Sequence, residues 1–200
     1  MSEDSFCLFG RSEKCVIERC TIFQCVNRKC HECLFLYLKV KKYNPNICDI
    51  DGNSLLHYSV YKNWLFGCYF LIQNGSFIDK QNSSGNTPLN VSILCNNFEI
   101  FVLLVEKGSN ISLQNILGQT PLHYICLGSM TKYLKYLISE KKELPINLKN
   151  NLGDTPLHCC AKVKFYEAFY LLVDLGANSK LKNNEDVKAF QILYSIPKKL

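Results

Sequence analysis

Pairs of large apolar residues recur along the chain at an almost constant spacing. They stand 33, 33 and 35 residues apart, and they are Leu71-Ile72, Leu104-Val105, Leu137-Ile138 and Leu172-Val173. Each pair lies in a short apolar run, which predicts a helix whose apolar face is buried between neighbouring repeats. The most aromatic run extends from Trp64 to Gln73, and we expect most of its aromatic residues to be buried in this way: Trp64, Phe66, Tyr69 and Phe70.

A second motif keeps the same phase ahead of each apolar pair. Its glycine suits a turn with positive φ, its threonine an N-cap, and its proline the first position of a helix. The motif begins at Gly85, Gly118 and Gly153, with a worn copy at Gly52. A further glycine, expected as a left-handed helix cap, follows the pair at Gly75, Gly108 and Gly176, and Lys141 replaces it once. One unit is therefore a turn, a helix, a short link, a second helix and a return loop.

This motif and its 33-residue period resemble the ankyrin repeat. The copies that carry the resemblance are Gly85-Asn86-Thr87-Pro88-Leu89-Asn90, Gly118-Gln119-Thr120-Pro121-Leu122-His123 and Gly153-Asp154-Thr155-Pro156-Leu157-His158. The resemblance covers about residues 20 to 192. It implies an all-α solenoid of stacked helix-turn-helix units joined by hairpin-like turns, with about five repeats and a C-terminal half repeat. We expect more than half of the residues to be helical. The alternative is an all-helical domain with fortuitous repetition.

The same phase predicts one domain behind a loose leader. The leader comprises residues 1–14, and the repeat domain comprises residues 15–200. Two extra residues fall within Ser139 to Pro145, where the cap glycine is absent and Pro145 must end the helix. The predicted repeats are a degenerate first repeat at 15–48, repeats at 51–81, 84–114, 117–149 and 152–182, and a capping half repeat at 185–200.

Composition adds few constraints to this picture. The net charge is +6, but the lysines are scattered, which favours a solubilising surface over a nucleic-acid site. No run approaches the ~20 apolar residues of a membrane helix, and no secretory signal is evident. We therefore expect a cytoplasmic protein, with the nucleus as an alternative, whose twelve cysteines are thiols. We predict a monomer with no membrane partner and no nucleic-acid partner.

No arrangement of side chains predicts catalysis. His57, His123 and His158 belong to the repeat motif, and the resemblance implies that their imidazoles bond to the backbone of the hairpin turns. No glycine-rich phosphate loop, paired-carboxylate motif or nucleophile elbow is found. We predict a protein that is not an enzyme and binds no cofactor.

Cysteines gather ahead of the first repeat and within it. Cys30 and Cys33 have a spacing that zinc can use, and Cys25 or His31 could join them. There is no second pair of this kind, and free cysteine also buries well as a small hydrophobe. We therefore predict no stoichiometric metal, with a thiol-responsive or metal-responsive protein as an alternative. The cluster is Cys7, Cys15, Cys20, Cys25, Cys30 and Cys33.

The resemblance implies that a partner protein binds along a concave face of turn tips and first helices. The positions one, four and five residues after the motif histidine are expected to be exposed there. Tyrosine is enriched among interface hot spots, although cover by neighbouring repeats would also explain such residues. The predicted partner-binding residues are Tyr58, Tyr61, Lys62, Leu94, Tyr124, Leu127 and Lys162, and the same exposure is expected of Val91, Cys95 and Cys159. The next candidates are the turn tips at Asp51, Ser84 and Asp154.

The sequence thus favours a non-catalytic protein–protein interaction module that regulates a partner by sequestration or scaffolding. This short array, with its degenerate repeats and its Asn-, Lys- and Ile-rich composition, resembles viral ankyrin proteins. That resemblance implies a host–virus interaction. Some of these viral proteins resemble I-kappa-B and inhibit Rel-family transcription factors, although such inhibitors tend to carry acidic segments and this chain is basic. Another alternative is an adaptor for ubiquitin ligases, but this chain shows no F-box-like segment after the half repeat.

Overall fold

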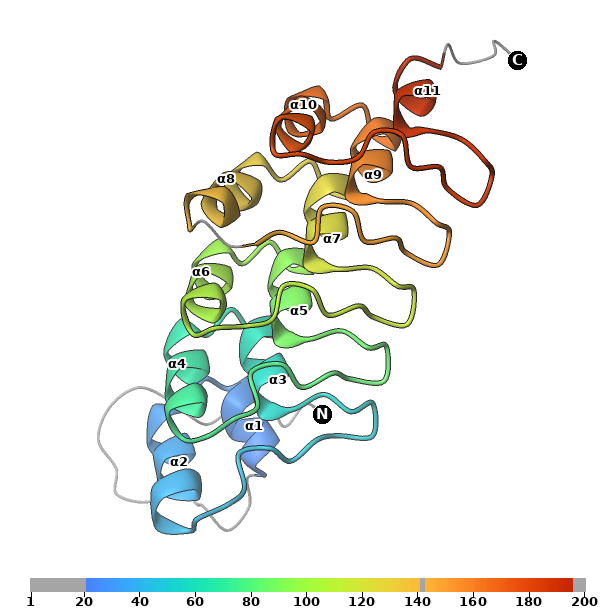
Figure 1. Cartoon of the computed structure of the whole chain (residues 1–200). Helices are drawn as coiled ribbons and strands as arrows, with labels where there is room; N and C mark the ends of the chain where they lie inside the picture. The colour runs from blue at the N-terminus through green and yellow to red at the C-terminus, as the bar shows by residue number, and fades with distance from the viewer. Residues whose placement is uncertain (1–20, 141–142, 196–200) are drawn as a thin grey trace, which may run out of the picture. The chain divides into compact units, whose positions relative to one another are not determined.

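The computed structural model describes residues 21–140 and 143–195, coloured along the chain in Figure 1. The predicted leader, Lys141 and the last five residues lie outside the described residues. The chain divides into two compact units, 1–77 and 78–200, and each is described by itself. We refer to them as unit 1 and unit 2.

Unit 1 holds two helix pairs. The first pair is α1 (Ile22–Asn27) and α2 (His31–Phe35), which continues as a π-helical turn, η1 (Leu36–Val40). The second pair is α3 (Leu55–Tyr61) and α4 (Leu65–Gln73). The first helices α1 and α3 pack on each other, and a hairpin loop leads from the first pair into the second.

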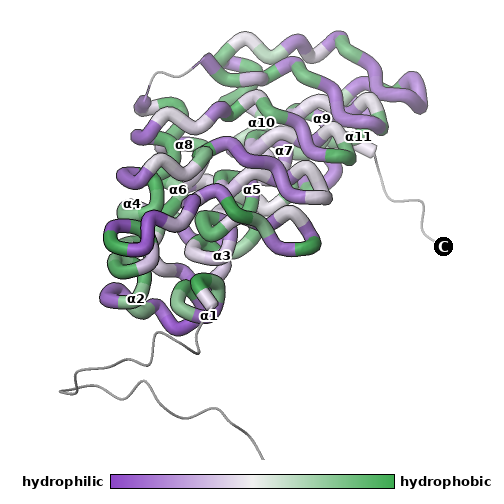
Figure 2. The backbone as a smooth tube through the Cα atoms, turned by 90° about the horizontal axis from the view of Figure 1, so that it is seen from below, coloured by the Kyte–Doolittle hydropathy of each residue, from purple (hydrophilic) through white to green (hydrophobic). Residues whose placement is uncertain are grey.

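Unit 2 continues the alternation. Its first helices are α5 (Pro88–Leu94), α7 (Pro121–Leu127), α9 (Pro156–Lys162) and α11 (Ala189–Leu193). Its second helices are α6 (Phe98–Glu106), α8 (Thr131–Ser139) and α10 (Tyr166–Asp174). Consecutive first helices pack together in one layer, and the second helices form a layer behind them (Figure 1). The hairpin loops project beside the first helices, and Figure 2 shows hydrophilic residues gathered in the loops.

The predicted all-α array with no sheet is confirmed. Within 21–140 and 143–195, β structure is limited to two isolated bridges, Cys48 with Ser54 and Lys182 with Lys188. The expectation that more than half of the residues would be helical is wrong, because helices cover slightly fewer than half of the described residues. The hairpins and return loops take the remainder of each repeat.

The first helices that follow a motif serine or threonine begin with the predicted cap, whereas α11 has Lys188 at that position. In unit 2, the Asn90 backbone N–H donates to Thr87 Oγ1 (3.3 Å), and Pro88 occupies the first helical position. The Thr120 backbone N–H donates to His123 Nδ1 (3.2 Å), so Nδ1 is an acceptor and Nε2 carries the proton. His123 Nε2 then donates to the carbonyl of Asp154 (3.1 Å) in the next hairpin. The motif histidine is therefore a structural link between repeats, as the resemblance implied.

The motif glycine is required by close approach as well as by its φ angle. Gly118 has φ +72°, and a Cβ built there would lie 2.8 Å from the backbone nitrogen of Asn151 in the following hairpin. The last hairpin carries Asp186 at this phase, with φ 62°. No further hairpin of the described residues follows it, so a side chain is sterically allowed there.

The second helices bury the residues that set the period. Leu104 and Leu137 are at most 1% exposed, as predicted. The cap glycines Gly75, Gly108 and Gly176 all have positive φ. In repeat four, α8 ends at Ser139 without such a glycine, which agrees with the placement of the two extra residues after it.

The expected burial of the aromatic run in α4 is wrong except at its first residue. Trp64 is buried, but Phe66 is 48% exposed, Tyr69 is also exposed and Phe70 is half-buried. Trp64 fills the interior, because a Cβ placed at the neighbouring Gly67 would lie 2.2 Å from the indole ring. Phe66 stands at the position of Glu99, Lys132 and Glu167, which are all exposed.

Candidate partner-binding surfaces

The predicted partner-binding residues of unit 2 differ in their surroundings. Leu94 is 53% exposed at the end of α5, and Tyr124 and Leu127 of α7 are half-buried. Lys162 is exposed and pairs through Nζ with the Asp154 carboxylate. Cys95 is exposed, as expected.

Two of the positions expected to be exposed are buried. Val91 and Cys159 directly follow the last residue of the motif, and each is at most 1% exposed. Cys159 lies in α9, which packs between α7 and α11, so a small side chain at this position is covered by neighbouring first helices. Tyr124 has the same repeat position and is longer, so it reaches from the helix to the hairpin.

The two tyrosines at this position brace the hairpins. In unit 2, Asn115 Nδ2 donates to the Tyr124 hydroxyl (2.6 Å), and burial raises the pKa of Tyr124. In unit 1, the Tyr58 hydroxyl donates to Asp49 Oδ2 (2.7 Å), which is the main cause that raises the pKa of Tyr58 to about 12. Tyr61 and Lys62 of unit 1 are exposed at the end of α3.

A side-chain acceptor that the sequence analysis missed holds every hairpin loop. At Asn115, Oδ1 accepts from the backbone N–H groups of Leu117 (3.0 Å) and Gln119 (2.9 Å). The same two bonds recur in each hairpin and satisfy backbone donors that the turn leaves unpaired. The sequence shows this acceptor as an Asn or Asp three residues before each motif glycine and three residues before Asp186. These residues are Asp49, Asn82, Asn115, Asn150 and Asn183.

These fixed hairpins present apolar side chains at their tips. In unit 2, Ile116 and Leu117 are 63% and 55% exposed, and Leu152 in the next hairpin is 63% exposed. The two tips are joined, because the Asn151 backbone N–H donates to the Leu117 carbonyl (3.0 Å) and Asn151 Nδ2 donates to the Ile116 carbonyl (2.9 Å). We call Ile116, Leu117 and Leu152 the tip patch.

The turn tips proposed from the sequence are only partly correct. Asp51 of unit 1 and Ser84 of unit 2 are exposed. Asp154 is 1% exposed, because it follows the glycine and turns inward. There its carboxylate accepts from Asn183 Nδ2 (3.0 Å) and pairs with Lys162.

The repeating caps, histidine links and hairpins agree with comparison to known proteins. A family model described as ankyrin repeats, in three copies, matches residues 22–115 and 103–183. The chain belongs to the ankyrin repeat family. No curated protein sequence matches it.

A solved structure shows the same ankyrin fold. It is the complex of a predatory endopeptidase from Bdellovibrio bacteriovorus with an immunity protein. The TM-score is 0.72 at 21% sequence identity, with 86% of this chain and 89% of the immunity protein covered. At this identity the match supports the fold alone.

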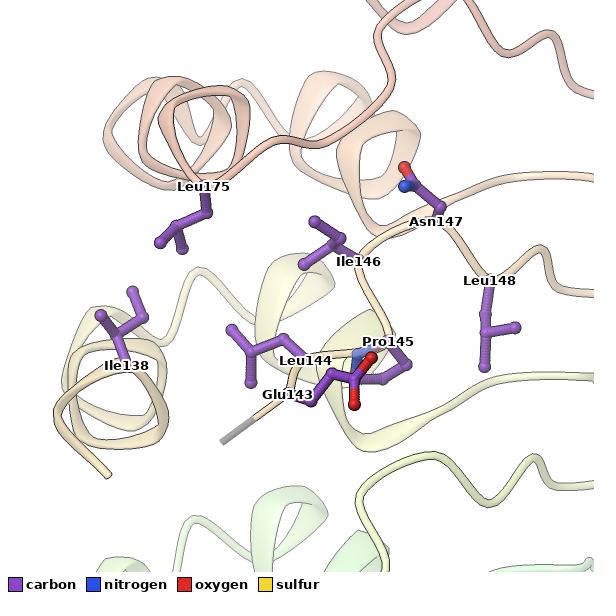
Figure 3. A pocket seen from close by; sticks show the side chains of 8 residues that line it. All are labelled: Ile138, Glu143, Leu144, Pro145, Ile146, Asn147, Leu148 and Leu175. Carbon is purple, nitrogen blue, oxygen red and sulfur yellow. The ribbon is translucent and has the colours of Figure 1, made fainter. Parts of the chain in front are cut away.

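The two extra residues of the fourth ankyrin repeat accompany a pocket in unit 2. It has a volume of about 740 Å³ and lies between the end of α8, the loop before Asn150 and the end of α10 (Figure 3). Ile138, Leu144, Ile146 and Leu175 face it, with Glu143 and Asn147 among the other lining residues.

Residues that could support other functions are embedded in ankyrin packing. Cys25 and Cys33 are buried and Cys30 is half-buried, while Cys7, Cys15 and Cys20 lie outside the described residues. In the part of the chain that the structure describes, no group of three or more His, Cys, Asp or Glu residues could hold a metal ion. None of the described helices has the length and apolar character needed to cross a membrane.

Proposed function

We propose that this ankyrin repeat protein is a non-catalytic regulator that binds a partner protein across the tip patch of unit 2. The observation that carries the proposal is the exposure of Ile116, Leu117 and Leu152 on two hairpins that are bonded to each other. Exposed apolar residues that gather on one surface mark interaction sites more often than single ones do. Binding at such a surface would regulate the partner by sequestration or scaffolding.

The construction of the hairpins favours tight binding. The side-chain Oδ1 atoms of Asn115 and Asn150 fix the two turns by accepting from backbone N–H groups of later turn residues, and the histidine link of His123 joins the hairpins. A surface that is already rigid loses little conformational entropy when a partner binds. We place the predicted residues Leu94, Tyr124, Leu127 and Lys162 beside this surface as secondary contacts, and Tyr58, Tyr61 and Lys62 as contacts of unit 1.

Two narrower functions and one separate alternative stay open. Inhibition of Rel-family transcription factors, as in viral I-kappa-B-like proteins, would place the protein in the cytoplasm or the nucleus. An adaptor role would need a second protein to supply the ligase. A thiol-responsive role would need the N-terminal cysteines. The immunity protein in complex with an endopeptidase is an example of this fold bound to another protein.

A comparative pull-down tests the tip patch. The double variant Leu117→Lys and Leu152→Lys should weaken capture of a partner by at least about 2 kcal/mol, the scale of hot spots. Tyr166→Lys is the matched control, because Tyr166 is 48% exposed on α10, a second helix. Equal capture by the double variant and the parent, with unchanged melting temperatures, would exclude the tip patch.

A further inference from the structure

Unit 1 has an apolar slot on its second helices, which we call the α2/α4 slot. It lies between α2 and α4 (Figure 1) and has a volume of about 350 Å³. Phe35 is 50% exposed and Phe66 is 48% exposed, so a large part of each ring is accessible to a ligand. The slot is separate from the tip patch, which belongs to the hairpins of unit 2. Its lining residues are His31, Glu32, Phe35, Leu36, Phe66 and Phe70.

The rings of the slot hold one another in place. Phe66 and Phe70 are stacked with their centroids 5.9 Å apart, and the His31 ring meets Phe66 edge-on at 4.3 Å. The orientation of His31 is fixed, because the Trp64 indole N–H donates to His31 Nε2 (3.1 Å). The walls of the slot are therefore arranged before a ligand binds, which lowers the entropy cost of binding.

The slot carries one negative charge. Among the described residues that line it, Glu32 is the one with a formal charge, because His31 accepts a hydrogen bond at Nε2 and is therefore neutral. Two lysines of the same segment are directed elsewhere. Lys29 Nζ donates to the Asn63 carbonyl (3.4 Å), and Lys41 Nζ lies 5.1 Å from the centroid of another ring. Aromatic faces beside a carboxylate attract a cation that is carried on an apolar body.

The same place in the repeat shows this attraction in unit 2. Two 33-residue periods separate Glu32 from Phe98, and two separate Phe66 from Lys132. The Lys132 ammonium lies over the Phe98 ring, so the chain supplies both the cation and the aromatic face. In unit 1 the face belongs to Phe66 and the charge to a carboxylate, which the negative face of a ring does not attract. Within the described residues no ion pair involves Glu32, so a cation placed between Glu32 and Phe66 would be attracted by both.

We propose that the α2/α4 slot binds a small organic cation with a quaternary ammonium group. Such a group has no N–H donor that needs a hydrogen-bond partner, whereas a primary ammonium is strongly hydrated and would lose that hydration among aromatic walls. The volume of the slot is near the lower limit of ligand pockets, which suits a small ligand. The ammonium lies between the Glu32 carboxylate and the Phe66 ring, and the apolar body of the ligand packs against Phe35 and Phe70.

The only tryptophan of the chain makes this proposal directly measurable. Trp64 gives the single indole N–H signal in an NMR spectrum of the full chain, and this N–H donates to His31 in the wall of the slot. Choline should shift the signal in a saturable way. The alcohol 3,3-dimethyl-1-butanol has the shape of choline without the charge, and it should bind at least about tenfold more weakly, because it makes no cation–π contact and no contact of opposite charges.

Three variants of the slot and two matched controls test the residues involved. Glu32→Gln and Phe66→Leu should each weaken choline binding at least about fivefold. Phe66→Lys, which puts an ammonium at the position of Lys132, should abolish binding, because the chain then supplies its own cation beside Glu32. Asp51→Asn and Phe77→Leu should leave the affinity unchanged, since both residues are exposed in unit 1 and neither lines the slot. The proposal is overturned if choline causes no saturable shift, if choline and its neutral analogue bind equally, or if Glu32→Gln binds choline as the parent does.

Discussion

Aromatic rings lie on the second helices of both units, but the two units use them differently. In unit 2, Phe101 of α6 is fully buried and meets the Tyr133 ring of α8 at 4.8 Å, and Lys132 Nζ lies 3.8 Å above the Phe98 ring. In unit 1, Phe35 and Phe66 are about half exposed around the α2/α4 slot, the pocket of about 350 Å³ between α2 and α4. The rings of α6 and α8 therefore stabilise unit 2 from inside, whereas Phe35 and Phe66 form an apolar surface in unit 1.

The difference comes from where each ring stands in its repeat. In unit 2 the Tyr133 hydroxyl donates to Asn96 Oδ1 (3.1 Å), so its ring can be buried without an unpaired polar group. Phe66 of unit 1 stands at the position that Glu99, Lys132 and Glu167 occupy in unit 2, where all three are exposed. An aromatic residue in this helix is therefore best interpreted together with the residues at the same position in the other repeats.

The largest expected effect separates buried from exposed rings. Phe101→Ala should lower the free energy of unfolding by about 3–5 kcal/mol, because it removes a fully buried ring and leaves a cavity. Phe66→Ala should cost less than about 1.5 kcal/mol, because half of that side chain is already in water. Chemical unfolding of both variants measures the difference. Equal losses would mean that the slot is part of the core and not a surface.

The sequence predicted the features that depend on local chemistry. The turn glycines, the threonine caps, Pro88 and its equivalents, and buried Leu104 and Leu137 all follow from backbone preferences and the period. Each of these preferences depends on only a few neighbouring residues and recurs in each repeat. The feature can therefore be recognised from the agreement between repeats.

Features that depend on contacts between repeats were not predicted. The burial of Val91 and Cys159 depends on which neighbouring helix covers a small side chain. The exposure of Phe66 could have been predicted from the period, because its position carries Glu99, Lys132 and Glu167 in the other repeats. The tip patch follows from no local rule, since Ile116 and Leu117 stand where turns usually carry polar residues. Of the predicted binding residues, Tyr124 proved to hold a hairpin, which its position alone did not indicate.

An effect of intermediate size concerns the buried histidines of unit 2. Burial lowers the pKa of His123 and of His158 in unit 2, so each is neutral in the folded state near pH 7. The unfolded histidine has a pKa of about 6.5, so below that pH the unfolded state binds a proton that the folded state does not. The free energy of unfolding therefore has its full value above pH 6.5 and decreases as the pH falls below it. Protonation would also disturb the bond that Thr120 donates to His123 Nδ1.

Hydrogen exchange of α7 at pH 7 and pH 5 measures this effect. The parent should lose protection at pH 5, and His123→Asn should reduce the difference between the two pH values, since Asn90 already occupies the equivalent position in the third repeat. His31→Asn is the control, because His31 is exposed in unit 1. An unchanged difference in His123→Asn would show that other groups cause the acid sensitivity.

The smallest expected effect concerns Lys132, whose ammonium group lies over the Phe98 ring of unit 2. It tests whether this lysine contributes to the difference between the aromatic rings of the two units. Lys132→Ala removes the cation above the Phe98 ring, and exposed cation–π pairs contribute about 0.5–1 kcal/mol. Lys135→Ala is the matched control, because Lys135 lies on the same helix as Lys132 but pairs with Glu167 of α10 and covers no ring. Chemical unfolding of Lys132→Ala with Phe98→Leu should show less than the sum of the two single losses, because the lysine then has no aromatic face to cover. Full additivity would mean that Lys132 acts only as a surface charge, and the contrast between the units would then depend on ring burial alone.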